Sequence, residues 1–242
     1  MINITAVLLV GGMGTRLRSV VSSGPKPLAR VGKLPFLELL VRQLQTQGIR
    51  RIVMCTGYLA EEIEKAFGNG RSGSNVTIQY SREDRPLGTA GAIKRAQNWL
   101  EKESAFLVMN GDSFLEADLS RLIRFHRDCK GLASLALVRV EDAGRYGTVQ
   151  VDSEKRVVGF REKTGDAAPG LINAGVYVFN REIFDQIPDV PSSLERDIFP
   201  QVLQRGIYGL ETHGMFIDIG TPEDYSRAQA LCDRLSSAAG RK

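Results

Sequence analysis

A glycine-rich loop that follows directly on a strand-forming run constrains this chain more than any other segment. Residues 4–10, Ile-Thr-Ala-Val-Leu-Leu-Val, form a short apolar run that predicts a buried first strand. Residues 11–18, GGMGTRLR, come next, and glycines at a strand end allow a tight turn whose N–H groups approach a phosphate closely. Ligands of open α/β sheets bind beyond the carboxyl ends of the strands, so the loop predicts an α/β fold with a phosphate site.

Two basic residues strengthen this prediction. Arg16 offers a rigid fork of donors to phosphate oxygens, and Lys26 is a point charge held between Pro25 and Pro27, whose φ angles are fixed. The spacing matches neither the P-loop nor the Gly-x-Gly-x-x-Gly dinucleotide turn. For the glycines alone, a β-turn with incidental basic residues is an equal alternative. Arg16 and the Pro-Lys-Pro segment favour a polyphosphate site, and therefore a nucleotide.

The length and charge of the chain narrow the classes of protein that it can represent. A chain of 242 residues predicts one domain, which we expect to cover residues 1–235 and to be followed by a frayed tail at 236–242. The 32 basic and 28 acidic residues give a net charge of +4 without a dense basic run. This balance suits anionic small molecules and does not resemble a nucleic-acid-binding module.

The cysteines and apolar segments predict a cytoplasmic protein. Cys55, Cys129 and Cys232 are odd in number and far apart, so we expect free thiols in a reducing compartment, and neither a zinc site nor disulfides. The first apolar run lacks the preceding basic residue and the small-residue cleavage site of a signal peptide. No apolar segment approaches the roughly 20 residues of a membrane span, and we expect no membrane partner.

The two halves of the chain predict different sheet organisation. The first half alternates strand and helix, which predicts a mostly parallel sheet with helices on both faces. Its expected strands are 51–56, 76–80 and 105–109, and its expected helices are 35–47, 59–67 and 88–100. The second half joins expected strands by short polar links, which predicts antiparallel pairing. These strands are 133–140, 147–151, 157–161 and 172–179, and two helices are expected at 193–204 and 222–235.

Two carboxylates stand where a ligand of such a sheet would bind. Asp112 follows the expected strand 105–109, and Asp218 lies between Ile217 and Ile219, an awkward setting for a mere surface residue. Either residue alone also fits a helix cap or a buried, hydrogen-bonded carboxylate. Both together suit Mg²⁺ beside a triphosphate, because Mg²⁺ takes one or two protein carboxylates plus phosphate oxygens. We therefore assign Asp112 and Asp218 to a Mg²⁺ site.

Polar residues at the later strands suit a sugar phosphate. Glu162 and Asn173 can form paired hydrogen bonds with hydroxyl groups, and Lys163 would meet a second phosphate. For Glu162 and Lys163 the alternative is a surface ion pair. Gly88 opens an expected helix, where it either offers backbone N–H groups or allows close packing. No serine or cysteine has a recognisable nucleophile setting, and both histidines, His126 and His213, lie outside these motifs.

Seven segments in this order carry a family resemblance: GGMGTRLR, PKPL, GTAG, NGD, FREK, INAGVY and FIDIGTPEDY. Together they resemble the sugar-1-phosphate nucleotidylyltransferase family and span nearly the whole chain. The resemblance implies a doubly wound, Rossmann-like α/β fold with a mixed sheet and a small β-rich sugar-binding portion. It also implies an enzyme that transfers a nucleoside monophosphate to a sugar 1-phosphate and releases pyrophosphate.

The resemblance further implies a role for each motif residue. Arg16 would hold the leaving β- and γ-phosphates and Lys26 the α-phosphate region, while Mg²⁺ would bridge the attacking and leaving groups. A sugar phosphate has a second pKa of about 6 and is anionic at neutral pH, so it needs no general base for in-line attack. Catalysis then rests on positioning and charge stabilisation. The implied nucleotide-binding residues are Gly11, Gly12, Gly14, Thr15 and Gly88, and the implied sugar-phosphate-binding residues are Gly147, Glu162, Lys163 and Asn173.

Finer features favour one branch of the family. Residues 19–22 are Ser-Val-Val-Ser where many relatives have Pro-Leu. With NGDSF and SLERDIFP, this variation resembles the branch that makes GDP-D-glycero-D-manno-heptose from GTP for a bacterial surface polysaccharide. The alternatives are a mannose-1-phosphate guanylyltransferase, a glucose-1-phosphate thymidylyl- or uridylyltransferase, and an inactive regulatory subunit that binds nucleotide sugars. Residues 82–87 are the candidate base-side loop, and a homo-oligomer is compatible with these features.

Overall fold

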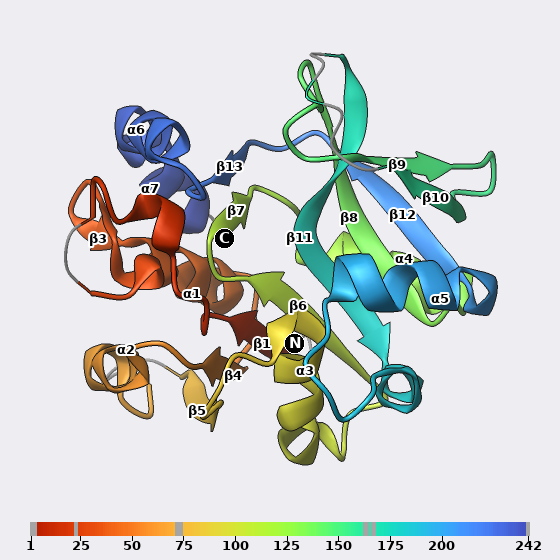
Figure 1. The fold of residues 1–242 in the computed structure, drawn as a ribbon, viewed down its shortest axis with the longest axis horizontal. Coiled ribbons are helices and arrows are strands. Elements are labelled where there is room, and N and C mark those ends of the chain that lie inside the picture. Colours follow the sequence, from red (N-terminus) through yellow and green to blue (C-terminus); the bar gives the residue numbers. More distant parts are fainter. Residues whose placement is uncertain (1–3, 22–23, 71–74, 162–164, 166–167, 241–242) are drawn as a thin grey trace.

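A seven-stranded sheet forms the centre of the molecule. The computed structural model describes residues 4–21, 24–70, 75–161, 165 and 168–240. The strand order of the sheet is β12-β8-β11-β6-β1-β4-β5 (Figure 1). Its strands are β1 Thr5–Leu9, β4 Arg51–Thr56, β5 Thr77–Arg82, β6 Ala105–Asn110, β8 Ala133–Val140, β11 Gly170–Asn180 and β12 Ile207–Thr212. The expected mixed α/β sheet is confirmed.

Strand β11 runs against the direction of its neighbours. Strand β1 pairs in parallel with β4 and β6, and β4 pairs in parallel with β5. Strand β11 is antiparallel to both β6 and β8, whereas β8 and β12 are parallel. The parallel first half is thus confirmed. The antiparallel prediction for the second half holds between β8 and β11 but is incomplete, because β12 was not anticipated and joins the sheet in parallel.

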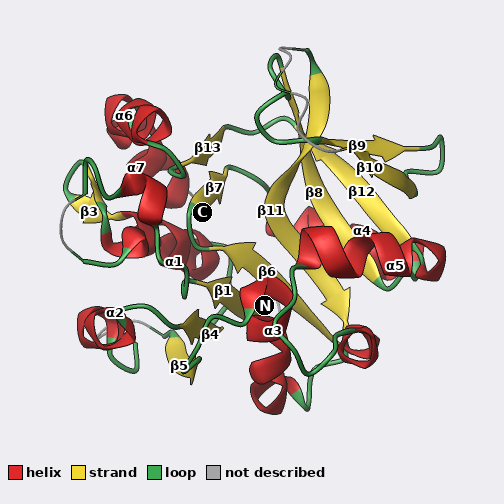
Figure 2. Cartoon of the chain, viewed as in Figure 1, coloured by secondary structure: helices red, strands yellow, loops and turns green. Residues whose placement is uncertain are grey.

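Apolar side chains cover both faces of the sheet. Alternate residues of a strand point to opposite faces. Accordingly, Val7 belongs to one hydrophobic cluster, while Ala6 and Leu8 belong to the other. Helices supply the opposing surfaces (Figure 2). The Ala6 side packs with α1 Phe36–Thr46, α2 Ala60–Phe67, α4 Leu119–Cys129 and α7 Cys232–Gly240, and the Val7 side with α3 Gly88–Arg95 and α5 Phe199–Val202.

Three two-stranded ribbons complete the β-structure. They are β2 Arg30–Val31 with β3 Leu34–Pro35, β7 Ser113–Leu115 with β13 Phe216–Asp218, and β9 Thr148–Val151 with β10 Val157–Arg161. The register of β7 and β13 places Asp218 opposite Ser113. Residues more than a hundred positions apart in the sequence therefore meet next to Asp112.

Several expected helices are broken or extended. The segment expected at 88–100 divides into α3 and a 3₁₀ turn, Gln97–Leu100. The segment expected at 193–204 consists of a π-helical turn, Leu194–Ile198, then α5 and a 3₁₀ turn, Leu203–Arg205. The segment expected at 222–235 divides at Leu231 into α6 Pro222–Ala230 and α7. Pro200 lies in the first turn of α5, where a missing N–H is tolerated.

The C-terminal residues are more ordered than we expected. Residues 236–240 form the second half of α7 instead of a frayed tail, and Ala239 is fully buried. The Thr46 hydroxyl at the end of α1 donates a hydrogen bond to the Ala239 carbonyl at 3.2 Å. Small apolar residues on one face of α7 thus dock the helix on α1.

Two expectations about the chain as a whole can be compared with the described residues. Within them, no helix is both long and apolar enough to cross a membrane. Cys55, Cys129 and Cys232 are free thiols.

Candidate active site

A cavity lies where the parallel strands β1, β4 and β6 end. We call it the first cavity; its volume is about 340 Å³, within the range of small-molecule sites. Its walls contain six of the predicted site residues and several unpredicted ones. The predicted residues are Gly11, Gly12, Gly14, Lys26, Gly88 and Asp112, and the others include Glu83, Thr89 and Asn110. The loop after the first strand therefore does border a ligand-sized space at the carboxyl edge of the sheet.

Two glycines of the glycine loop leave no room for a side chain. Gly14 has a φ of +58°, and a Cβ placed there would lie 2.7 Å from the Cβ of Lys26. A Cβ on Gly11 would lie 2.8 Å from Oε1 of Glu83 and 3.2 Å from the backbone nitrogen of Gly57. A side chain at either position would displace the residues that border the first cavity. At Gly12 a Cβ would meet no atom within 4 Å, so packing does not require that glycine.

A second cavity adjoins the first. Its volume is about 400 Å³, and it shares Gly14, Lys26 and Asp112 with the first cavity. Its other walls are formed by Thr15, Arg16, Arg145, Tyr146, Asp218, Gly220, Thr221 and Asp224. Lys26 and Asp112 thus lie at the boundary between the two cavities. The first cavity is lined by the glycine loop, and the second by Arg16, Arg145 and Asp218.

An ion pair connects the two shared charged residues. Lys26 Nζ donates to Asp112 Oδ2 at 2.7 Å, and the lysine side chain is only 12% exposed. Its mount is a 3₁₀ turn, Lys26–Leu28, in which Pro27 occupies the first turn and is buried. The predicted stiff setting of Lys26 is therefore observed, and its charge points at Asp112.

Asp112 lies close enough to Asp218 to influence the ionisation of Asp218. The Ser113 hydroxyl donates to Asp218 Oδ2 at 3.2 Å and lies 3.4 Å from Asp112 Oδ1. Burial and the negative charge of Asp112 raise the pKa of Asp218, against the opposing effect of Lys26. The backbone N–H of Gly220 donates to Asp218 Oδ1. A divalent cation would relieve the repulsion between the two carboxylates.

Arg16 reaches the same region from the glycine loop. It lies in the 3₁₀ turn Thr15–Leu17 and lines the second cavity. Arg16 forms no ion pair with a carboxylate of the described part of the chain. Its guanidinium donors remain available to an anion in the second cavity.

The structure only partly brings together the predicted sugar-side residues. Gly147, with a φ of +77°, directly follows Arg145 and Tyr146 of the second cavity. Asn173 lies outside the walls of both cavities, and its amide donates to the Tyr177 hydroxyl at 2.9 Å. Glu162 and Lys163 lie outside the described residues.

A partly buried polar network connects Asn173 with the first cavity. The Tyr177 hydroxyl donates to Glu195 Oε1 at 3.2 Å, and Thr89 donates to Glu195 Oε2 at 3.1 Å. Ser193 donates to the same oxygen at 2.9 Å. Burial raises the pKa of Tyr177 well above its usual value. The segment SLERDIFP therefore supplies Glu195, which holds Thr89 at the first cavity and Tyr177 beside Asn173 in fixed positions.

Glu83, Asn110 and Tyr146 are among the wall residues that were not assigned from the sequence. Glu83 Oε2 accepts a hydrogen bond from the Leu87 backbone at 3.1 Å, and burial raises the pKa of Glu83. Asn110, the last residue of β6, has a buried Oδ1 without a partner in the described chain. Tyr146 lines the second cavity. The position of Asn110 at a strand end and the location of Glu83 in the expected base-side loop were the available signals.

Comparison with known proteins identifies relatives of this chain. The model of the nucleotidyl transferase family matches residues 5–234. Mannose-1-phosphate guanylyltransferase of Mycobacterium tuberculosis is 42% identical over 94% of this chain, which spans 64% of that relative. D-glycero-alpha-D-manno-heptose 1-phosphate guanylyltransferase of Aneurinibacillus thermoaerophilus is 42% identical over 93% of this chain and 96% of its own length.

A solved structure shares the same fold. The crystal structure of HddC from Yersinia pseudotuberculosis in complex with GMP-PN superposes with a TM-score of 0.84 at 35% identity. The match covers 94% of this chain and 98% of HddC. The Rossmann-like fold and the family resemblance of the motifs are confirmed, and the chain belongs to the nucleotidyl transferase family.

Proposed function

We propose that this protein transfers GMP from GTP to a sugar 1-phosphate and releases pyrophosphate, with D-glycero-α-D-manno-heptose 1-phosphate as the preferred acceptor. The observation that carries the proposal is the Lys26–Asp112 pair at the boundary of two cavities, with Arg16 and Asp218 on the second. A phosphoryl centre at this boundary would have a basic residue and a carboxylate beside it. The relative named for heptose 1-phosphate, aligned over 96% of its length, supports the choice of acceptor.

The phosphate roles follow from the positions of the two basic residues. Lys26 is shared by both cavities and would bind the α-phosphate, where the acceptor oxygen attacks. Arg16, which lines the second cavity, would bind the β- and γ-phosphates that leave as pyrophosphate. A guanidinium fork matches two phosphate oxygens at once, and a lysine held in place stabilises charge where it develops. The N–H groups of Gly11, Gly12, Gly14, Thr15 and Gly88 would complete the nucleotide site.

Asp112 and Asp218 fit a Mg²⁺ site. Two adjacent carboxylates, one with a raised pKa, gain from a shared cation. The described residues contain no group of three or more metal-ligating side chains, which agrees with the preference of Mg²⁺ for few protein ligands plus phosphates and water. When bound, Mg²⁺ would neutralise charge on the reacting phosphates. Ser113 and the Gly220 N–H orient Asp218 for that role.

Glu83 provides a physical reason for a guanine base. Its carboxylate lines the first cavity and also a smaller adjoining one of about 200 Å³. A carboxylate accepts hydrogen bonds only, and guanine presents two adjacent donors, N1–H and the N2 amino group. The Watson–Crick edge of thymine or uracil presents a single N–H between two carbonyl groups. A carboxylate would repel the oxygens of these carbonyl groups. Glu83 therefore favours GTP over UTP or dTTP.

The sugar side is proposed to comprise Gly147, Glu162, Lys163 and Asn173. Gly147 adjoins the second cavity through Tyr146. Asn173 is held by Tyr177, so its carbonyl and amide have fixed directions before a sugar arrives. Preorganised polar groups of this kind bind hydroxyls without a further loss of side-chain freedom. Lys163 would bind the acceptor phosphate.

Mannose 1-phosphate is the second candidate acceptor. The mycobacterial relative named for that substrate is as similar, at 42% identity, as the relative named for heptose. The two sugars differ by one carbon far from the anomeric phosphate, a difference worth about 1–3 kcal/mol in an apolar pocket. We favour the heptose because this chain spans 96% of that relative and 64% of the mycobacterial one.

Pyrophosphate release in the presence of Mg²⁺ tests the proposal. We would cross GTP, ATP, UTP and dTTP with the 1-phosphates of D-glycero-D-manno-heptose, mannose and glucose. Turnover restricted to GTP and heptose 1-phosphate is the expected result. Preference for another pair would replace the substrates, and binding without turnover would favour the regulatory subunit.

We also propose a cytoplasmic location, which suits the three free cysteines.

A further inference from the structure

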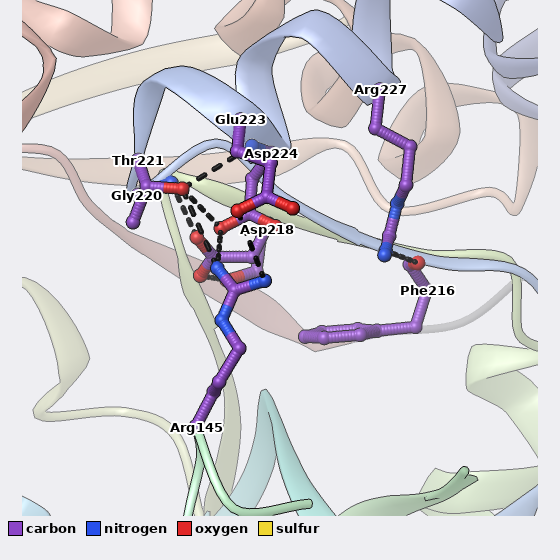
Figure 3. A network of polar contacts seen from close by, with 9 residues as sticks. Arg145, Phe216, Asp218, Gly220, Thr221, Glu223, Asp224 and Arg227 are labelled. Atoms are coloured by element: carbon purple, nitrogen blue, oxygen red, sulfur yellow. Dashed lines mark hydrogen bonds and ion pairs between the residues drawn. The ribbon is translucent and has the colours of Figure 1, made fainter. Parts of the chain in front are cut away.

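One arginine connects two distant segments across the mouth of the second cavity. Arg145 lies in the turn at residues 141–147, between β8 and β9, and its side chain reaches the start of α6 (Figure 3). The segment before α6 is β13, which carries Asp218. The turn and the Asp218 segment thus face each other over the cavity, and both contribute to its walls.

The contact is an ion pair with a buried partner. Arg145 Nη2 donates to Asp224 Oδ2 at 2.7 Å, and the Asp224 side chain is 4% exposed. Thr221 caps α6 and donates its hydroxyl to the same Asp224 oxygen at 2.7 Å. A buried carboxylate is stable in its charged form only when it is paired and hydrogen-bonded. Arg145 therefore provides the counter-charge that Asp224 requires, and we call this pair the Arg145–Asp224 clasp.

The residue after Arg145 makes a second contact with the Asp218 segment. The Tyr146 ring packs edge-on against Phe216 with the ring centroids 5.8 Å apart. Phe216 is the first residue of β13 and Asp218 the last. The turn therefore holds the segment that contains Asp218 on both sides, at Phe216 through Tyr146 and at Asp224 through Arg145.

We propose that Arg145 is a positioning residue for the transfer reaction. Through the Arg145–Asp224 clasp it fixes Tyr146 and Gly147 relative to Asp218, so that the sugar-phosphate wall stands at a set distance from the metal-binding carboxylates. The inference rests on the proposed function, because it concerns the acceptor half of that same site. A displacement of about 1 Å between reacting groups lowers turnover by up to about 100-fold, so a clasp of this kind has kinetic consequences.

A second arginine pair, on the strand that precedes the turn, provides a control. Arg139 near the end of β8 pairs with Glu211 of β12, with Nε and Oε1 3.0 Å apart. Neither residue lines either cavity. Arg139→Gln removes an ion pair of similar length close to the same turn, without touching the Asp218 segment. It therefore separates a general loss of an ion pair from a loss of positioning.

The test compares Arg145→Lys, Arg145→Gln, Asp224→Asn, the double variant Arg145→Gln/Asp224→Asn, and Arg139→Gln. We would measure kcat and the KM values for GTP and for the sugar 1-phosphate, with thermal midpoints. We expect kcat/KM for the sugar 1-phosphate to fall about 10- to 100-fold in Arg145→Gln. The loss for GTP, whose β- and γ-phosphates are proposed to lie against the same cavity, should be clearly smaller. The double variant, which leaves no buried unpaired carboxylate, should lose no more than Arg145→Gln. Arg145→Lys should recover part of the loss.

Three results would overturn the proposal. The first is a loss of kcat/KM in Arg145→Gln that is equal for GTP and the sugar 1-phosphate. The second is an equal loss of kcat/KM in Arg139→Gln. The third is a loss in the double variant equal to the product of the losses in the two single variants. Absence of turnover in the unaltered protein would instead overturn the proposed function. In that case, amide hydrogen exchange at residues 143–147 still tests the clasp. Faster exchange in Asp224→Asn than in Arg139→Gln supports it, and equal exchange overturns it.

Discussion

Asp112 is held by a lysine on one side and faces a second carboxylate through Ser113 on the other. Replacing Asp112 with Asn preserves its shape and removes its charge, so we expect the fold to persist and Mg²⁺-dependent turnover to fall by about 100-fold or more. A Mg²⁺ titration of pyrophosphate release, with circular dichroism as the check on folding, measures both. Unchanged turnover in this variant would remove Asp112 from the metal site.

Glu83 offers a test of base selection at the same scale. Glu83→Gln keeps the volume of the side chain but presents an amide to the guanine edge, so we expect kcat/KM for GTP to fall by about 10- to 100-fold, equivalent to 1–3 kcal/mol. The values for UTP and dTTP should rise relative to GTP. Glu61→Gln is the control, because Glu61 is 80% exposed and pairs with Arg82. An unaltered nucleotide preference in Glu83→Gln would place base selection elsewhere.

Individual residues were predictable from the sequence where their chemistry is local. The glycine loop and Lys26 could be assigned because the features that define them are local. The loop follows a strand end and contains Gly14, which has a positive φ, and Lys26 lies between two prolines. Glu83 and Asn110 could not, since their roles depend on which segments fold against them. Glu83 becomes part of the site through Gly11 and Gly57, which lie next to its carboxylate. No local pattern records that contact.

At the scale of elements, periodicity predicted position better than it predicted boundaries. The strands β1, β4, β6, β8 and β11 and the helix α1 lie close to their expected residues because their apolar patterns are strong. The segment 193–204 was expected as one helix, but Glu195 faces Thr89 and Tyr177 within a π-helical turn. Strand β12 contains Gly209, whose position beside Leu137 leaves no room for a side chain. Tertiary contacts, not intrinsic preference, decided both segments.

The N-cap of α4 provides a test at this scale. Asp118 accepts a hydrogen bond from the Arg121 backbone at 3.1 Å. Asp118→Ala should lower the free energy of unfolding by about 0.5–2 kcal/mol, because the cap is lost. Asp118→Asn should retain most of the stability, since Asn caps helices as well as Asp does. Urea unfolding measures the difference, and equal losses in both variants would show that the charge of Asp118 matters more than its cap.

For the whole molecule, the burial of His126 predicts that the free energy of unfolding depends on pH. It is 2% exposed, with Nδ1 3.0 Å from the Ser134 hydroxyl and Nε2 3.1 Å from Asn180 Oδ1. Burial lowers the pKa of His126 below its ordinary value of 6.5. The unfolded chain therefore binds this proton more readily than the folded one. Its contribution to stability is present above pH 6.5 and is lost as the pH falls from there to the folded pKa.

Urea unfolding between pH 5 and 8 measures this contribution. The slope due to one group cannot exceed about 1.4 kcal/mol per pH unit. We expect His126→Gln to flatten the curve below pH 6.5 relative to the unaltered protein. His213→Gln, at an exposed histidine, is the control for the substitution of a histidine by glutamine. Identical slopes in the His126 variant and the unaltered protein would show that another group causes the loss.

The antiparallel strand β11 has a consequence for how the chain is made. It lies between β6 and β8 and pairs with both. During synthesis, β1, β4, β5 and β6 can assemble once residue 110 has emerged, whereas β8 at Ala133–Val140 has no neighbour in the sheet until β11 at Gly170–Asn180 follows. A nascent chain that stalls between these points carries two open strand edges, which invite association with other chains. We therefore expect the interval between residues 140 and 170 to be the stage of translation at which these edges are most open to association.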